Sequence, residues 1–309
     1  MTRKKMELRE ERDFGQKFNA VFTFVQTNFK SFFKVIGLTV GPLALIGGFF
    51  FGLVYSNIFG SMGSVMNNIN PEDPLRLSMN NPMLSWGANL IFSYFFLGVA
   101  SLWMMIAVYA FMAEYDRGNE NITIEAVWKR GKDKIMPTIG LGILMILAMV
   151  FFVGIILALP MNNALAIFFK AVILIVGLFY VLFPLSLVVP NMVIDDAGVF
   201  ESIGRSFALI RGKWWSTFGL LTVMSFISSF ASLIFAIPLY VGMVINLLMR
   251  TGAGETLTVV GSCIYFLGSF LLTSLPMLAI GFQYFNLVER KEGTGLLRKM
   301  DMIGKPEPV

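Results

Sequence analysis

The stretch ITIEAVWKRGKDKIMPTIGLGILMILAMVFFVGII, residues 122–156, joins two kinds of helix in one segment. Its second part is apolar almost throughout and exceeds the roughly 20 residues that a membrane-spanning helix needs. Its first part sets three apolar residues on one helical face beside two cations: Ile124, Val127 and Trp128, with Lys129 and Arg130. The stretch therefore predicts an amphipathic helix at the headgroup level that leads into a membrane span.

The same order occurs three times, in residues 14–51, 122–156 and 199–235. In the first copy, Lys17 falls off an apolar face that comprises Phe14, Phe18, Val21, Phe22, Val25 and Phe29. In the third copy, Arg205 and Arg211 fall off a face that comprises Val199, Ile203 and Phe207. This three-fold internal repeat predicts three interfacial amphipathic helices, which act either as surface-lying connectors or as a surface that docks partners or senses lipid.

Each copy has its own start and end signals. We predict that Thr123 caps the second amphipathic helix and that Asp195 or Asp196 caps the third, because short polar side chains accept from the free N–H groups there. A cationic and aromatic junction that ends at Lys30, Lys134 or Lys213 then opens each span.

The composition places the chain in a membrane. Of its 309 residues, 56% are hydrophobic and 14% are charged, against about 25% charged in soluble domains. Six apolar stretches are long enough to cross a bilayer: 32–55, 83–112, 135–159, 164–189, 215–248 and 256–287. We therefore expect an all-α polytopic protein of six transmembrane helices.

The basic residues predict the orientation. With six spans both termini share one side, and that side holds 21 of the 24 lysines and arginines. Since cytoplasmic loops carry such an excess, we predict an inner-membrane protein with both termini in the cytoplasm. The charged N-terminus does not read as a signal peptide. We expect one membrane domain over 1–309, with an amphipathic segment 1–30, a six-helix bundle 31–288 and a cytoplasmic tail 289–309.

Residues 189–215 carry a resemblance. VPNMVIDD at 189–196, VFESIGRSF at 199–207 and LIRGKWW at 209–215 resemble a pattern of bacterial six-span proteins, the glycerophosphoryl diester phosphodiesterase membrane-domain family and its uncharacterised relatives. The resemblance implies a six-span bacterial fold and a membrane location. It implies no reaction, because the phosphodiesterase chemistry of that family lies in a separate soluble domain that this sequence lacks.

Catalytic chemistry has little support in the sequence. Histidine is absent, and the single cysteine, Cys263, lies in an apolar run. No phosphate-binding loop or nucleophile elbow is present. We predict no enzyme activity, no catalytic or metal-binding residue, no cofactor and no nucleic-acid partner, and the oligomeric state stays open.

Two functions fit these patterns. The first is a scaffold or subunit of a bacterial envelope complex that contacts protein partners or lipid headgroups on its cytoplasmic face, through Lys129, Arg130, Arg205, Arg211, Lys213, Trp214 and Trp215. The alternative is a transporter or binder of lipid or small amphiphile. It would work between helices kinked at Pro42, Pro184, Pro238 and Pro276. Close helix packing is another interpretation of these breakers and of the Gly48–Gly52 step.

Overall fold

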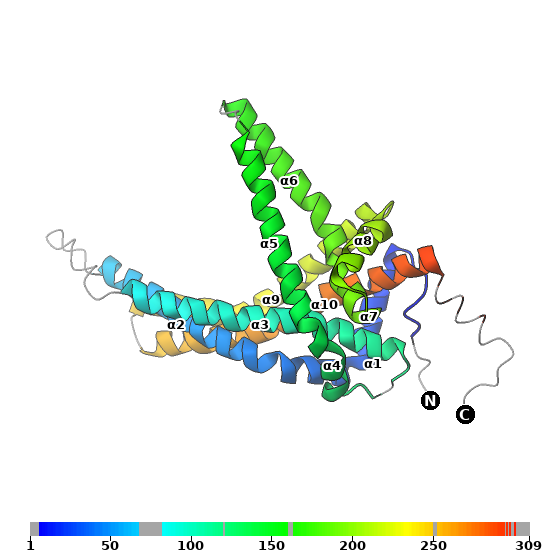
Figure 1. Cartoon of the computed structure of the whole chain (residues 1–309). Coiled ribbons are helices and arrows are strands. Elements are labelled where there is room, and N and C mark those ends of the chain that lie inside the picture. Colours follow the sequence, from blue (N-terminus) through cyan, green and yellow to red (C-terminus); the bar gives the residue numbers. More distant parts are fainter. Residues whose placement is uncertain are drawn as a thin grey trace. The chain divides into compact units, whose positions relative to one another are not determined.

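The structure is a computed structural model that describes residues 6–67, 82–119, 121–159, 163–249, 252–293, 295, 297 and 300, without the side chains of 63–67 and 82–85. These residues contain helices and no strand (Figure 1). The helix bounds are α1 Phe14–Thr39, α2 Gly41–Asn67, α3 Pro82–Asp116, α4 Ile124–Gly131, the 3-10 turn η2 Lys132–Lys134, α5 Ile135–Ala158, α6 Ala164–Ser186, α7 Val188–Ile194, α8 Val199–Ile210, α9 Trp214–Met249 and α10 Gly252–Glu292.

Among the described residues, six helical segments are long and apolar enough to cross a membrane. They are Gly41–Met62, Trp86–Asp116, Ile124–Ala158, Ala164–Ile194, Trp214–Met249 and Gly252–Glu292. This confirms the all-α class and the six apolar helices. The repeat, the interfacial position of the short helices and the side on which the termini lie stay predictions. Between the first two predicted spans, residues 68–81 lie outside the described residues, as does most of the predicted tail after Gly293.

The first candidate span begins later than predicted. Helix α1 runs unbroken through Lys30, and the change of element comes at Val40. The Val40 N–H donates to the Ile36 carbonyl at 2.8 Å. Pro42 lies in the first turn of α2, where a backbone N–H has no acceptor within the helix, so the N–H that proline lacks removes no hydrogen bond of α2. The candidate span therefore starts at Gly41 and not at residue 32, so the junction predicted at Lys30 was wrong.

The residues group into two compact units. Unit 1 comprises Met1–Ser31, Ile106–Val223 and Pro276–Val309, and unit 2 comprises Phe32–Met105 and Met224–Leu275. The prediction of one membrane domain over 1–309 concerns the whole chain and stays a prediction.

Unit 2 is built on close helix contacts. A Cβ on Gly48 would meet the Cys263 Cα at 3.1 Å, and one on Gly261 would meet the Leu239 Cα at 2.6 Å. The buried Asn246 donates to the Ser56 carbonyl at 2.7 Å, which joins α9 to α2. Small residues and buried amides thus allow backbones to approach in this unit, as the packing interpretation of the glycine step expects.

In unit 1 the buried face of α1 differs from the predicted one. Lys17 and Phe24 are buried, whereas Phe14 and Phe29 at the ends of the predicted face are exposed. The Lys17 Nζ donates to the Gln283 Oε1 at 2.8 Å and to the Ser216 Oγ at 3.2 Å. Lysine was placed off the buried face because its charge normally keeps it in water. Here the amide and the hydroxyl replace that water.

Two prolines inside helices release carbonyls that side chains then bind. Pro184 of α6 has no N–H for the Tyr180 carbonyl, four residues earlier, and the Trp214 Nε1–H donates to that carbonyl at 3.3 Å. In α10, Pro276 likewise frees the Leu272 carbonyl, to which Ser228 donates at 3.0 Å. Each proline therefore creates an acceptor for a donor on α9, and a freed backbone group in a span needs such a partner.

Candidate functional site

The turn between α7 and α8 holds two adjacent carboxylates, Asp195 and Asp196. Asp196 adopts a positive φ of 61°, a conformation that Asp tolerates better than most residues. Helix α8 begins after Gly198, whose N–H donates to the Glu201 side chain. The prediction that Asp195 or Asp196 caps α8 was therefore wrong: both are used as counter-ions, on opposite sides of the turn.

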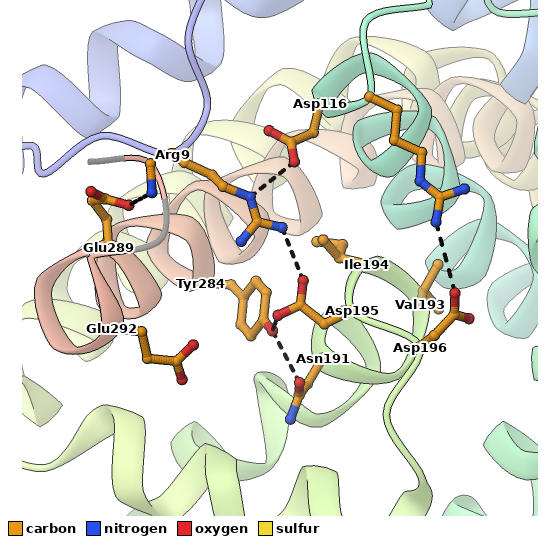
Figure 2. Close-up of polar contacts among 12 residues, drawn as sticks. Arg9, Asp116, Asn191, Val193, Ile194, Asp195, Asp196, Tyr284, Glu289 and Glu292 are labelled. Atoms are coloured by element: carbon orange, nitrogen blue, oxygen red, sulfur yellow. Dashed lines mark hydrogen bonds and ion pairs between the residues drawn. The ribbon is translucent and has the colours of Figure 1, made fainter. Parts of the chain in front are cut away.

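Asp195 accepts from three chain segments, and Figure 2 shows two of its donors, Arg9 and Tyr284. Its Oδ1 lies 2.9 Å from the Nη2 of Arg9, which also places its Nε 2.9 Å from the Asp116 Oδ2. Its Oδ2 lies 2.7 Å from the hydroxyl of Tyr284 on α10. The N-terminal segment and α10 thus meet at the carboxylate of the α7–α8 turn, and Arg9 joins that carboxylate to the end of α3.

Arg205 completes this group from α8. Its Nη1 lies 2.9 Å from the Asp195 Oδ2 and 2.6 Å from the Asn191 Oδ1. Its Nε and Nη2 donate to the two carboxylate oxygens of Glu292 at 3.0 and 2.7 Å, a bidentate pair. The donors of Arg205 are therefore occupied within the protein.

Asp196 serves a second basic group. Its Oδ2 lies 2.7 Å from the Arg130 Nη1 of α4, and its Oδ1 lies 2.9 Å from the Lys134 Nζ of η2. Arg130 also donates to the backbone carbonyls of Val193 and Ile194, at 3.1 and 2.7 Å, and so satisfies the free carbonyls at the end of α7. Arg130 ties α4 to α7 and does not project into solvent.

The charges shift one another's ionisation. Burial would raise the pKa of Asp195, but its bonds to Tyr284, Arg9 and Arg205 outweigh burial and lower that pKa below its usual value. The same balance lowers the pKa of Asp196, through Lys134, Arg130 and Arg117. Burial lowers the pKa of Lys17, which Asp13 only partly offsets. Both aspartates are therefore charged near neutral pH.

The remaining predicted residues lie apart from this charge network. Trp214 packs at the start of α9 with its ring 5.6 Å from Phe218 and 5.0 Å from Phe183 of α6. Trp215 is 75% exposed. Lys129 and Arg211 are exposed, and neither they nor Lys213 form an ion pair within the part of the chain that the structure describes. The structure brings Arg130 and Arg205 together at the α7–α8 turn. Among the described residues, Trp214 and Trp215 take no part in the contacts of that turn.

Two apolar hollows share Tyr180, and the tryptophans line one of them. One, of about 450 Å³, lies between α5 and α6; its lining includes Ala148, Phe152 and Gly177. The other, of about 550 Å³, is lined by Ile175, Val176, Phe179, Tyr180, Trp214, Trp215 and Phe218. Helices α5 and α6 form a hairpin, and Figure 1 shows that they diverge away from the end at which they are connected. Most described side chains of this hairpin are exposed, so nothing in unit 1 covers much of its apolar surface.

Sequence reasoning missed Arg9, Asp116, Tyr284 and Glu292. Arg9 meets Asp195 across 186 residues of chain and Tyr284 meets it across 89, and no periodicity within a helix reports such pairs. The one available signal was the aspartate pair itself: a cap uses one carboxylate at most, so the second needed another role.

The geometry defines an all-α fold whose described residues include six helical segments long and apolar enough to cross a membrane, with a charge network at the α7–α8 turn that holds the short helices. The chain belongs to the family described as Domain of unknown function (DUF7847), whose profile matches residues 30–287. Neither the search of curated proteins nor that of solved structures found a match. The family match gives no link to the glycerophosphoryl diester phosphodiesterase membrane domain, so that resemblance stays a prediction.

Proposed function

We propose that this chain is a non-enzymatic protein of the bacterial inner membrane, with both termini cytoplasmic, that binds lipid or a small amphiphile at the α5–α6 hairpin. The observation that carries the proposal is the pair of apolar hollows that meet at Tyr180. Their volumes of about 450 and 550 Å³ fall in the range of ligand sites, about 300–1,000 Å³. Trp214 and Trp215 border the second hollow, as aromatic rings do near headgroups.

The state of the cations favours this function over the scaffold. Arg130 and Arg205 are two of the seven residues predicted to contact partners. Arg130 donates to Asp196 and to a backbone carbonyl of α7, and Arg205 donates to Asp195 and Glu292. A partner that needed either guanidinium would have to break these contacts. The apolar surface of the hairpin is free of any such competition.

Photocrosslinking with a diazirine-bearing fatty acid in membranes tests the proposal. We expect labelling to concentrate in residues 145–152 and 177–185, and Ala148→Phe, which fills the first hollow, to reduce it at least five-fold. The matched control is Ala158→Phe, the same change at an exposed position of α5 outside the hollow. Uniform labelling of all exposed apolar helices, or equal effects of the two variants, would contradict a site.

A scaffold role is the second candidate, because Arg211 and Lys213 form no ion pair in the described parts of the chain and Phe200 of α8 is 78% exposed. Co-purification from native membranes would test it. Arg211→Glu with Lys213→Glu should remove a specific partner that the control Lys132→Glu retains. An unchanged set of partners would count against the scaffold.

A further inference from the structure

A polar hollow separate from the apolar ones lies between the end of α3 and α4. It has a volume of about 410 Å³ and is lined by Glu114, Arg117, Ala126, Lys129 and Arg130. Three of its five lining residues are cations, and all five come from a segment of 17 residues of unit 1.

Two of these cations, Arg117 and Lys129, have N–H groups that form no hydrogen bond with a described residue. The Arg117 guanidinium lies between two carboxylates, 3.8 Å from the Glu114 Oε1 and 3.8 Å from the Asp196 Oδ2. Both distances are too long for hydrogen bonds, so these are ion pairs without directed N–H contacts. Lys129 is exposed and forms no ion pair with any described residue.

The third cation is fixed. Arg130 has a side chain only 9% exposed, with Nη1 on Asp196 and Nε and Nη2 on the end of α7. It therefore forms a rigid cationic wall. Rigid cations bind an anion with less loss of side-chain freedom than mobile ones.

The charges of the hollow do not balance. Its lining has three cations, Arg117, Lys129 and Arg130, and one carboxylate, Glu114, which is a formal excess of two positive charges. Asp196 and Lys134 lie next to Arg130, pair with each other and add one charge of each sign, so the excess is unchanged. Glu125, one turn before Lys129 on α4, does not line the hollow. A phosphate monoester carries a charge of about −1.5 to −2 near pH 7, so one such group would neutralise the excess.

We infer that this hollow binds a phosphate group, with Arg117 and Lys129 as its movable donors and Arg130 as its fixed wall. Arginine presents paired N–H groups that match phosphate oxygens, and lysine adds a point charge. A phosphorylated lipid headgroup and a soluble phosphate ester share this chemistry. The inference does not rest on lipid binding at the α5–α6 hairpin, which is a different surface.

The test uses the full chain in nanodiscs, with two probes. Calorimetry with inorganic phosphate, in nanodiscs of phosphatidylcholine, reports a soluble ligand. Native mass spectrometry of chain purified with mixed phosphatidic acid and phosphatidylcholine reports a headgroup. We expect saturable binding in at least one arm, and at least ten-fold weaker binding in Arg117→Gln and in Lys129→Gln.

The control is Lys132→Gln, an exposed cation of η2 that does not line the hollow. It should keep wild-type binding, whereas any general surface attraction of anions would weaken equally in all three variants. Binding of phosphate identifies a soluble ligand, and binding of phosphatidic acid alone identifies a headgroup. No binding in either arm, or Arg117→Gln and Lys129→Gln matching the control, overturns the inference. Lys129 is exposed, so its variant remains informative if Arg117→Gln fails to fold.

Discussion

At the scale of single residues, the two adjacent carboxylates of the α7–α8 turn pair with different groups of basic side chains. Successive side chains outside a helix point apart, and the positive φ of Asp196 turns its side chain toward α4 while Asp195 meets Arg9 and Arg205. The sequence could place both aspartates at a helix start. It could not supply their partners, because five of these lie far away along the chain: Arg9, Arg117, Arg130, Lys134 and Tyr284.

Asp195→Asn should destabilise the protein by about 2–3 kcal/mol. The change leaves Arg9 and Arg205 partly buried with one counter-charge fewer, and breaking a buried ion pair from one side leaves the other charge uncompensated. Thermal unfolding in mild detergent measures the effect. Asp133→Asn, at an exposed position of η2, is the control and should change the midpoint little. Equal losses would show that the Asp195 contacts add no stability.

The same carboxylate predicts a dependence on acid. Its pKa is lower in the folded protein than the roughly 3.9 of a free Asp side chain. The stabilisation is then complete above about pH 4 and is lost as the pH falls through the lower, folded pKa. We expect the difference in unfolding midpoint between wild type and Asp195→Asn to stay constant from pH 8 to pH 5 and to shrink below about pH 4. A difference that already shrinks between pH 7 and pH 5 would contradict the lowered pKa.

At the scale of elements, the sequence predicts several helix starts, because these depend on the residues next to them. It does not predict which side chains bind the backbone groups that interruptions of a helix leave free. Thr123 caps α4 as predicted, with its Oγ1 accepting from the Ala126 N–H at 3.2 Å. The α5 and α9 spans open directly after Lys134 and Lys213, also as predicted. The prolines were expected to kink their helices, but the side chains that bind the carbonyls released by Pro184 and Pro276 lie on another helix and have no signal in the sequence.

The pair Pro184 and Trp214 can be tested as a double-mutant cycle. Trp214→Phe leaves the Tyr180 carbonyl without its donor and should cost about 1 kcal/mol of stability from this bond. In a Pro184→Ala background the new N–H of residue 184 can serve that carbonyl, so the same change should cost about 1 kcal/mol less. Unfolding midpoints of the four proteins give the coupling. Additive effects would mean that the two residues do not share this acceptor.

Two glycines of the α8 region should respond to alanine with opposite signs. Gly212, just past the end of α8, has a φ of +79°, which costs a residue with a Cβ roughly 1–2 kcal/mol. Gly204 lies inside α8 with open space where a Cβ would be, so alanine there should add about 0.5–1 kcal/mol. Unfolding midpoints of Gly212→Ala and Gly204→Ala in the same detergent check this. Equal signs would rule out a left-handed end to α8.

At the scale of the whole molecule, the amino-acid composition and the long apolar stretches were enough to predict an all-α fold with six long apolar helices. Six long apolar helices follow from stretches of hydrophobic residues, and each can be recognised without knowing its neighbours. Which surfaces of those helices are covered depends on packing between distant segments. The burial of Lys17 and the exposure of the α5–α6 hairpin were for that reason not predicted.

The predicted topology can be measured by labelling cysteines with a membrane-impermeant maleimide. In a Cys263→Ala background, Glu11→Cys and Lys132→Cys should react in inverted inner-membrane vesicles and resist in right-side-out vesicles. Ala253→Cys, between the last two spans, should do the reverse. All three positions are exposed in the structure, so a failure to react reports the membrane side and not burial. Reaction of all three from one side would overturn the six-span topology.

The position of Arg9 has a consequence for biogenesis. Its partner Asp195 is made 186 residues later, and Tyr284 follows after another 89. At synthesis rates of roughly 5–20 residues per second, Arg9 stays without Asp195 for about 9–37 s, and Tyr284 follows about 4–18 s later. Arg9 can meet Asp116 after 107 residues, but the full set of contacts that anchors the amino-terminal segment forms only once α10 has been made.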